Sequence, residues 1–193
     1  MRLLGLTTAA VLALGATAAF GQTRPAPIPP AAPAAPAGTT AEGAKAGYLS
    51  RFGPFAEWPA SAFDTPQSPL VICVVGADPF GPKLDESVKD QTFEGRAMVV
   101  RRLEKVEKAS ACQIAFIVGG AGQTPAEALT VLRGAPVLTV TDEKRSSQAR
   151  GIIHFVTQDE RQRFIIDDQA AAQNHIVLSS KLKSLALSVK ARE

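Results

Sequence analysis

The stretch VICVVGADPFG, residues 71–81, is an apolar run that ends in a turn containing glycine and proline. A continuous run rich in Val and Ile is typical of a strand that is buried on both faces of a sheet. In the turn, Asp78 and Pro79 predict a helix with Asp78 as its N-cap and Pro79 at its first position, continuing through Leu84 and Val88. The stretch therefore predicts a strand followed by a helix, the repeating unit of an α/β domain.

The same alternation continues along the chain. Three further runs are strand-like, and they are Arg96–Leu103, 113–119 and 136–141. Between the last two, Thr124 is a good N-cap, Pro125 suits the first helical position and Glu127 completes a capping box, while Gly134 predicts the helix end. Strands that alternate with helices over short links predict a mostly parallel sheet.

The carboxyl-terminal part has a different pattern. Residues 152–157 and 162–166 are two strand-like runs separated by QDER, which predicts an antiparallel hairpin. A short alanine-rich helix is expected over 168–174. Ser179 or Ser180 then caps a final amphipathic helix. Its apolar side carries Leu182, Leu185, Ala186 and Val189, and its other side carries Lys181, Lys183 and Lys190. A helix this short, with one narrow apolar stripe, is expected to pack on the sheet, with no stable membrane insertion.

Together these patterns predict a doubly wound, Rossmann-like α/β fold with helices flanking a mostly parallel sheet. Before the first strand, Tyr48, Phe52 and Phe55 have the spacing of one helix face. The dipeptide Gly53-Pro54 is expected to kink or break that helix, because proline lacks the amide donor. Trp58-Pro59 then ends it.

The amino-terminal segment predicts export. Residues 1–21 combine Arg2, a short apolar region and small residues before Gln22, which is typical of a cleaved signal peptide. A retained membrane anchor is disfavoured, because the apolar region is too short to span a bilayer. Residues 22–41 hold six of the fourteen prolines, all between Pro25 and Pro36, and predict an extended linker. Residues 42–193 are then expected to form a single domain.

The charge of the chain argues against nucleic acid as a partner. The formal charge is +3, and removal of Arg2 with the signal segment leaves +2. Lysine and arginine are interspersed with aspartate and glutamate, as on an ordinary solvated surface.

Two cysteines, Cys73 and Cys112, occur in the chain. An even number in an exported protein predicts a disulfide. The two can meet if the third strand lies beside the first, as in the 2-1-3 order of doubly wound sheets. A redox pair or a metal site are the alternatives, but the chain has neither CxxC spacing nor clustered histidines.

Catalytic machinery is not evident in the sequence, and we expect neither an enzyme nor a cofactor or metal site. The turns at 77–81 and 119–124 follow strands and open helices but lack the phosphate-loop pattern. His154 lies inside a strand and is expected to be structural. The pair Asp167-Asp168 lies at a strand-to-helix boundary, where helix capping explains it.

Several motifs, in order, resemble the YfiR-like family. They are FAEWP (55–59), VICVVGADPFG (71–81), the approach to a strand at 112–114, PVLTVTD (136–142), GIIHFV (151–156), RFIID (163–167) and LSSKLKSLA (178–186). The resemblance implies a periplasmic repressor that binds the periplasmic sensory domain of an inner-membrane diguanylate cyclase and so lowers cyclic di-GMP. It also implies homodimers, no catalytic residues and the bridge between the first and third strands. Some members have a second bridge after the fourth strand, where this chain has DEKRSSQARG and no cysteine.

The resemblance also suggests roles for individual residues. Structural motif residues are Trp58, Pro59, Gly76, Asp78, Pro79, Phe80, Gly81, Gly151, Ser179 and Ser180, of which Trp58 and Phe80 are expected to pack in the core. Arg163, Asp167 and Lys181 are candidates for a surface that faces the partner. Structural ion pairing is the alternative role for these three residues.

The sequence is also compatible in outline with two functions other than a protein-binding regulator. A non-catalytic periplasmic sensor would bind a small ligand in the crevice of the sheet, lined by the loops at 77–81, 119–123 and 142–150. An envelope hydrolase would need a nucleophile that the sequence does not offer.

Overall fold

The computed structural model describes residues 40–146 and 148–192. The expected signal segment and nearly all of the expected linker lie outside the described residues. The α-helices are α1 (Ala41–Leu49), α2 (Pro82–Val88), α3 (Pro125–Leu132), α4 (Asp168–Gln173) and α5 (Ser180–Leu185), and short 3-10 turns lie at Gly53–Phe55, Ala60–Ala62 and Lys108–Ser110. The strands are β1 (Ala56–Glu57), β2 (Leu70–Gly76), β3 (Thr92–Phe93), β4 (Arg96–Leu103), β5 (Ile114–Gly119), β6 (Leu138–Asp142), β7 (Ile153–Gln158), β8 (Arg161–Asp167), β9 (Val177–Leu178) and β10 (Val189–Lys190).

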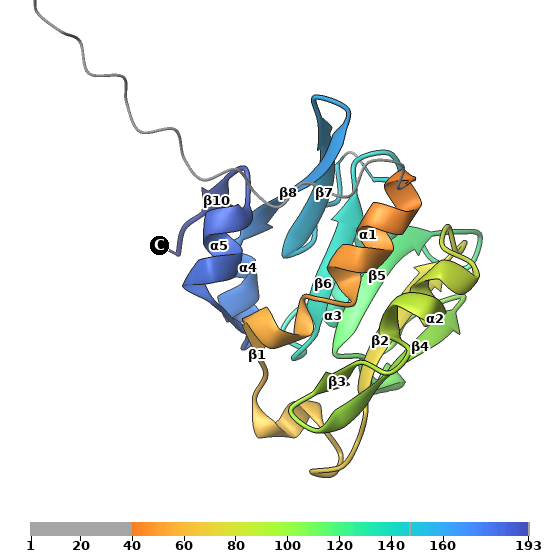
Figure 1. The fold of residues 1–193 in the computed structure, drawn as a ribbon, viewed down its shortest axis with the longest axis vertical. Helices are drawn as coiled ribbons and strands as arrows, with labels where there is room; N and C mark the ends of the chain where they lie inside the picture. The colour runs from red at the N-terminus through yellow and green to blue at the C-terminus, as the bar shows by residue number, and fades with distance from the viewer. Residues whose placement is uncertain (1–39, 147, 193) are drawn as a thin grey trace, which may run out of the picture. The chain divides into compact units, whose positions relative to one another are not determined.

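One sheet forms the centre of this fold, with the strand order β10-β8-β7-β6-β5-β2-β4-β3 (Figure 1). The five neighbouring strands β4, β2, β5, β6 and β7 run parallel to one another. The β7–β8 pair is antiparallel, with Phe155 opposite Phe164. The predicted mostly parallel sheet and the terminal hairpin are therefore both confirmed. β1 and β9 form a separate two-stranded pair.

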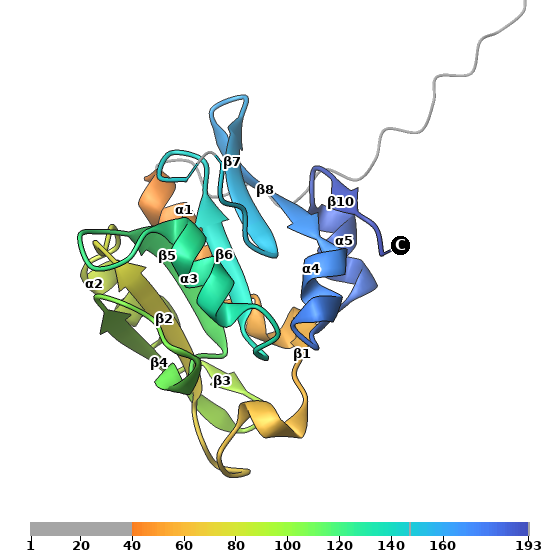
Figure 2. The same cartoon turned by 180° about the vertical axis from the view of Figure 1, so that it is seen from behind.

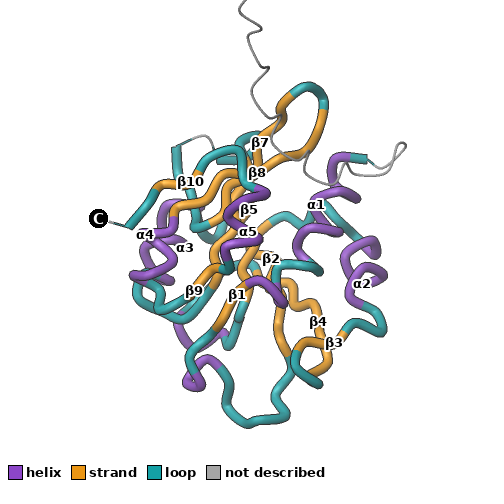
Figure 3. Tube along the Cα trace, turned by 60° about the vertical axis from the view of Figure 1, so that its left-hand side comes forward, coloured by secondary structure: helices purple, strands orange, loops and turns teal. Residues whose placement is uncertain are grey.

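Helices cover both faces of the sheet, as the doubly wound prediction requires. Helices α1 and α2 lie on one face, and α3 lies on the other (Figures 1 and 2). The tube in Figure 3 shows the strands as a layer between α1 and α2 on one side and α3 on the other. The reversal of direction falls between β2 and β5, because β2 leads through α2 to β4 while β5 leads through α3 to β6.

Each face has its own apolar core. Beneath α1 and α2, Phe52, Phe116 and Phe155 are almost fully buried. The ring of Phe155 lies between the other two and contacts both. Beneath α3, the smaller core contains Ile117 and Leu132 together with both cysteines. The alternation of β2 side chains between these two cores explains why its sequence is apolar at every position.

The disulfide between Cys73 and Cys112 is present, as predicted. Cys73 lies in the middle of β2, Cys112 lies two residues before β5, and their Cα atoms are 5.8 Å apart. β5 is the direct neighbour of β2, with Cys73 opposite Ala115. The predicted strand order and the predicted bridge are thus confirmed together.

The helix after β2 begins later than predicted, which corrects the roles of Asp78 and Pro79. Gly81 is the N-cap of α2, and Pro82 is at its first position. Asp78 instead closes a turn of its own, because its Oδ1 accepts a hydrogen bond from the amide of Phe80 at 2.7 Å. That turn directs the Phe80 ring into the core, 4.9 Å from the ring of Phe116. Gly81 has a φ of +54°, which separates the turn from the helix.

The last helix is shorter than predicted. Ser179 is its N-cap, and α5 ends at Leu185, so Val189 and Lys190 belong to β10 and not to the helix. The physical reason is the open edge of β8. The amide of Leu187 donates to the carbonyl of Phe164, and the amide of Ile166 donates to the carbonyl of Ser188. Pairing with β8 therefore replaces the last helical turns.

The first helix is broken, as Gly53-Pro54 predicted, although the break comes earlier. α1 ends at Leu49, and Gly53–Phe55 form a 3-10 turn. Tyr48 and Phe52 still stack on each other, with ring centroids 6.2 Å apart. No helix in the described ranges has both the length and the apolar character needed to cross a membrane.

The disulfide leads to a stability prediction. Replacing both Cys73 and Cys112 by alanine should lower the free energy of unfolding by about 4 kcal/mol, because the 39-residue loop is no longer closed in the unfolded chain. Urea denaturation followed by circular dichroism measures this difference. Reductant should destabilise the parent protein and leave the double variant unchanged. Equal unfolding midpoints for the parent and the variant would show that the bridge does not restrain the unfolded chain.

Candidate functional site

The carboxyl end of β6 carries a buried ion pair. Nζ of Lys45, on α1, lies 2.5 Å from Oδ2 of Asp142, and both side chains are at most 3% exposed. The other carboxylate oxygen of Asp142 accepts from the amide of Lys144 at 3.1 Å. The pair joins α1 to the end of a central strand, and sequence reasoning did not identify it. The only local signal was a lysine on the otherwise apolar side of a helix.

His154 is structural, as predicted, and lies on the opposite face of the sheet from that pair. Its Nδ1 is 2.8 Å from the hydroxyl of Thr141, which also accepts from the amide of Gly151. Burial, reinforced by the positive charge of Arg150, lowers the pKa of His154. Gly151 is required here because a Cβ would come within 2.7 Å of the Thr139 carbonyl oxygen. The imidazole is therefore held as a neutral, hydrogen-bonded part of the sheet.

Arg102 on β4 organises the turn that leads into α2. Its guanidinium contacts the carboxylates of Asp78 at 2.7 Å and Asp85 at 2.5 Å and donates to the carbonyl of Gly81. The hydrogen bond from Arg102 lowers the pKa of Asp85, and the two carboxylates raise the pKa of Arg102 above its usual range. Asp78 thus has a structural role, as expected. It does not cap α2 but binds the turn at Phe80 and Arg102 of β4.

Trp58 is held in place by a hydrogen bond to Gln113. Gln113 lies in one of the motifs of the sequence, but the sequence did not predict a role for it. The indole Nε1 of Trp58 donates to the carbonyl of Gln113 at 3.2 Å. The buried side chain of Gln113 accepts from the amide of Val71 and donates to the carbonyl of Ala62. Gln113 therefore ties the segment around Trp58-Pro59 to the start of β2.

The crevice proposed for a small ligand lies between β2 and β5, where the ends of the two strands are in close contact. The amide of Ala77 donates to the carbonyl of Gly119, and a Cβ on Gly119 would meet Pro125 at 2.6 Å. In the following turn, the amide of Gly120 bonds the carbonyl of Gln123, whose side chain makes two hydrogen bonds with the backbone of Val106. Two of the three proposed lining loops are therefore held by internal contacts.

Arg163, Asp167 and Lys181, proposed as a partner surface, have different surroundings. Arg163 and Asp167 lie on the same face of β8, both partly exposed. Asp167 caps α4 by accepting from the amide of Ala170 and forms an exposed ion pair with Lys190. Lys181 is exposed on α5, with its Nζ 5.7 Å from the ring centroid of Phe55. Capping and ion pairing thus account for Asp167, and a partner surface at these residues stays a prediction.

The carboxyl-terminal elements are held by one buried carboxylate. Asp168 is 6% exposed and forms ion pairs with Lys183 on α5 and with Arg192 beyond β10. Ser179 accepts from the amide of Leu182 and so caps α5, whereas Ser180 is the first helical residue. These contacts fix α4, α5 and β10 to one another at the β8 end of the sheet.

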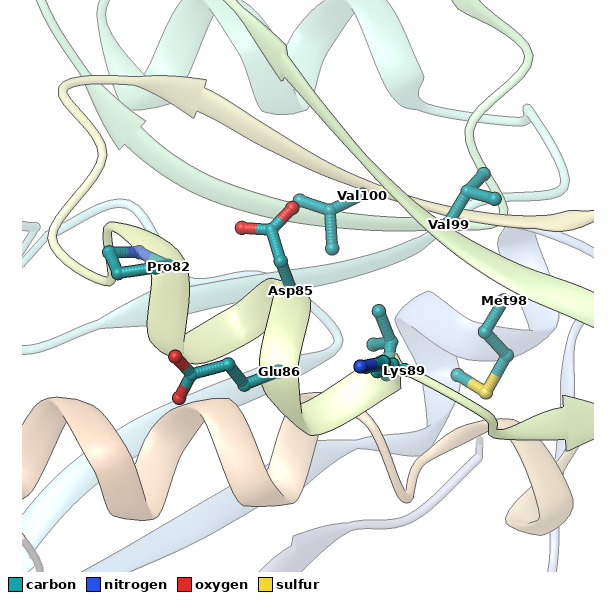
Figure 4. Close-up of a pocket in the computed structure, with 8 residues that line it drawn as sticks. Pro82, Asp85, Glu86, Lys89, Met98, Val99 and Val100 are labelled. Atoms are coloured by element: carbon teal, nitrogen blue, oxygen red, sulfur yellow. The ribbon is translucent and has the colours of Figure 1, made fainter.

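A groove lies at the opposite end of the sheet, between α2 and β4. It has a volume of about 510 Å³. Figure 4 shows Asp85, Glu86 and Lys89 on the helical side and Met98 and Val100 on the strand side. Val99, on the other face of β4, is 37% exposed. This groove is a concave, partly apolar surface near one edge of the sheet.

The comparisons with known proteins agree with the resemblance. A model of the YfiR/HmsC-like family matches residues 42–187, which is more than half of the chain. No curated protein matches the chain.

The buried ion pair generates a prediction about stability. Replacing Lys45 by methionine should lower the free energy of unfolding by about 3–5 kcal/mol, because the buried carboxylate of Asp142 is left without its cation. Chemical denaturation at neutral pH measures the change. The double variant Lys45→Met/Asp142→Asn should recover part of the loss.

Lys190→Met provides the matched control. Its partner Asp167 is 32% exposed, so the loss should stay below about 1 kcal/mol. Equal losses in Lys45→Met and Lys190→Met would show that burial of the Lys45 pair has no energetic consequence.

Proposed function

The chain belongs to the YfiR/HmsC-like family, and we propose that it is an exported periplasmic regulator that binds and restrains a membrane-bound diguanylate cyclase. Restraint of that enzyme lowers cyclic di-GMP. The observation that carries the proposal is the family match over residues 42–187, which includes both cores and the strands from β1 to β9. In this proposal the partner contacts the regulator through its own periplasmic sensory domain.

The use of the buried polar groups supports action by surface contact. Asp142 is paired with Lys45, His154 is bonded to Thr141, and Asp168 is paired with Lys183 and Arg192. A reactive group needs access to a substrate, and these three side chains are buried. These groups instead serve contacts that hold elements of the fold together, as expected of a binding scaffold.

Two features support the periplasm as the compartment. Residues 1–21 have the pattern of a signal peptide, and the single pair of cysteines forms a disulfide that an oxidising compartment preserves. Residues 22–41 would then act as an extended spacer between the processed end and the folded domain. Homodimer formation, which the family resemblance implies, is part of the same proposal.

Deletion of the gene tests the proposed function. Cyclic di-GMP, measured by mass spectrometry of cell extracts, should rise in the deletion strain and return to the parental level when the full chain is restored. The rise should disappear when the responsible cyclase is also deleted. Candidate cyclases are the membrane-bound ones with a periplasmic domain, removed one at a time. An unchanged cyclic di-GMP level in the single deletion would contradict the proposal.

A further inference from the structure

We propose that the outer edge of β4, with the groove beside α2, binds an extended peptide segment of a partner protein. The segment would add to the sheet as one more strand, with apolar residues at its centre and a carboxylate at the end that lies near Arg101. The inference goes beyond the proposed function, because the properties of this edge are independent of which enzyme is regulated.

The backbone of β4 is open on its outer side over half of the strand. β3 pairs only with Arg96 and Ala97. The amide of Met98 points outward, since it donates to the carbonyl of Gln91 at 3.4 Å. Backbone groups alternate in direction along a strand, so those of Val100 and Arg102 also point outward. In the ranges that the structure describes, no strand pairs with them, and such an edge is a template for an added strand.

The side chains beside this edge offer places for alternate residues of an added strand. Met98 and Val100 face α2 and line the groove, as Figure 4 shows, while Val99 faces the other side and is 37% exposed. Successive side chains of an extended segment point to opposite faces. One set would enter the groove against Val88 and Val100, and the other would cover Val99.

The charges of β4 favour an acidic partner. The strand carries three arginines and no carboxylate. Arg102 is neutralised by Asp78 and Asp85, and Arg96 lies opposite Phe93 of β3 with its guanidinium 4.1 Å from the ring centroid of Phe63. Arg101 lies on the open part of the strand, and among the described residues its guanidinium bonds only the carbonyl of Ser110. Arg101 therefore follows Val99 and Val100 on the open part of the strand. Opposite charges across neighbouring strands attract, so a carboxylate of the added segment should lie near Arg101.

The same charges disfavour a second copy of this chain as the occupant. Pairing two β4 edges would bring the arginines of both copies into one small interface, and like charges across strands are destabilising. An acidic, apolar-centred segment of another protein satisfies both the backbone and the charge of the edge.

Peptide binding to the purified protein tests this inference. The probe is acetyl-Glu-Val-Thr-Val-Thr-Val-Glu-amide, and the matched control peptide has lysine in place of both glutamates. The acidic peptide should bind about tenfold more tightly than the basic one, as measured by fluorescence anisotropy of labelled peptides. It should also slow hydrogen exchange at the amides of Val100 and Arg102. Equal affinity of the two peptides, or protection of these amides before any peptide is added, would overturn the inference.

Variants of the edge locate the binding. Arg101→Glu should reverse the preference, so that the basic peptide binds more tightly, while Arg161→Glu on the distant hairpin should leave both affinities unchanged. Val100→Pro should abolish binding, because it removes an outward amide. If that variant does not fold, the exposed substitution Arg101→Glu decides, and an unaltered preference in Arg101→Glu contradicts the proposed edge.

Discussion

The contact between β2 and β5, closed by the disulfide between Cys73 and Cys112, is the constraint on which the rest of the structure depends. It places the third strand of the α/β pattern beside the first, so α2 and α3 must leave toward opposite faces. The two apolar cores follow from that division, one beneath α1 and α2 and the other beneath α3. The bridge lies within the smaller core and stabilises the fold mainly by restraining the unfolded chain.

The contact between β2 and β5 also sets the backbone geometry at the crevice between these strands. The meeting point of β2 and β5 is where doubly wound proteins commonly bind ligands, and here the backbone at Gly76 and at Gly119 is in close contact. Buried charges near the sheet ends are matched internally, by Lys45 with Asp142 and by Asp168 with two cations. The surfaces proposed for other molecules lie at the two ends of the strand order. One end carries the open part of β4, and the other carries β8, β10 and the residues first proposed as a partner surface.

Local patterns predicted most of the fold, because their physical causes are local. The apolar run of β2 and the capping box of Thr124 and Glu127 act within a few residues, and both are present. The predicted start of α2 was wrong, because Asp78-Pro79 and Gly81-Pro82 are both sequences that suit the start of a helix. Two contacts favour the later start: the Phe80 ring is buried in the core, and Asp78 forms an ion pair with Arg102. The predicted length of α5 was wrong because Val189 pairs with β8. The helical pattern of the sequence gives no sign that the edge of β8 is open to such pairing. Lys45 and Asp142, 97 positions apart, meet only in the folded chain.

The central claim is that the folded domain acts outside the cytoplasm to hold cyclic di-GMP low, and cyclic di-GMP in three complemented deletion strains tests it most directly. One strain carries the full chain, one lacks residues 2–21, and one has those residues replaced by an unrelated export signal. The account predicts a low cyclic di-GMP level in the first and third strains and a high level in the second. Equal repression by the chain that lacks residues 2–21 would contradict it.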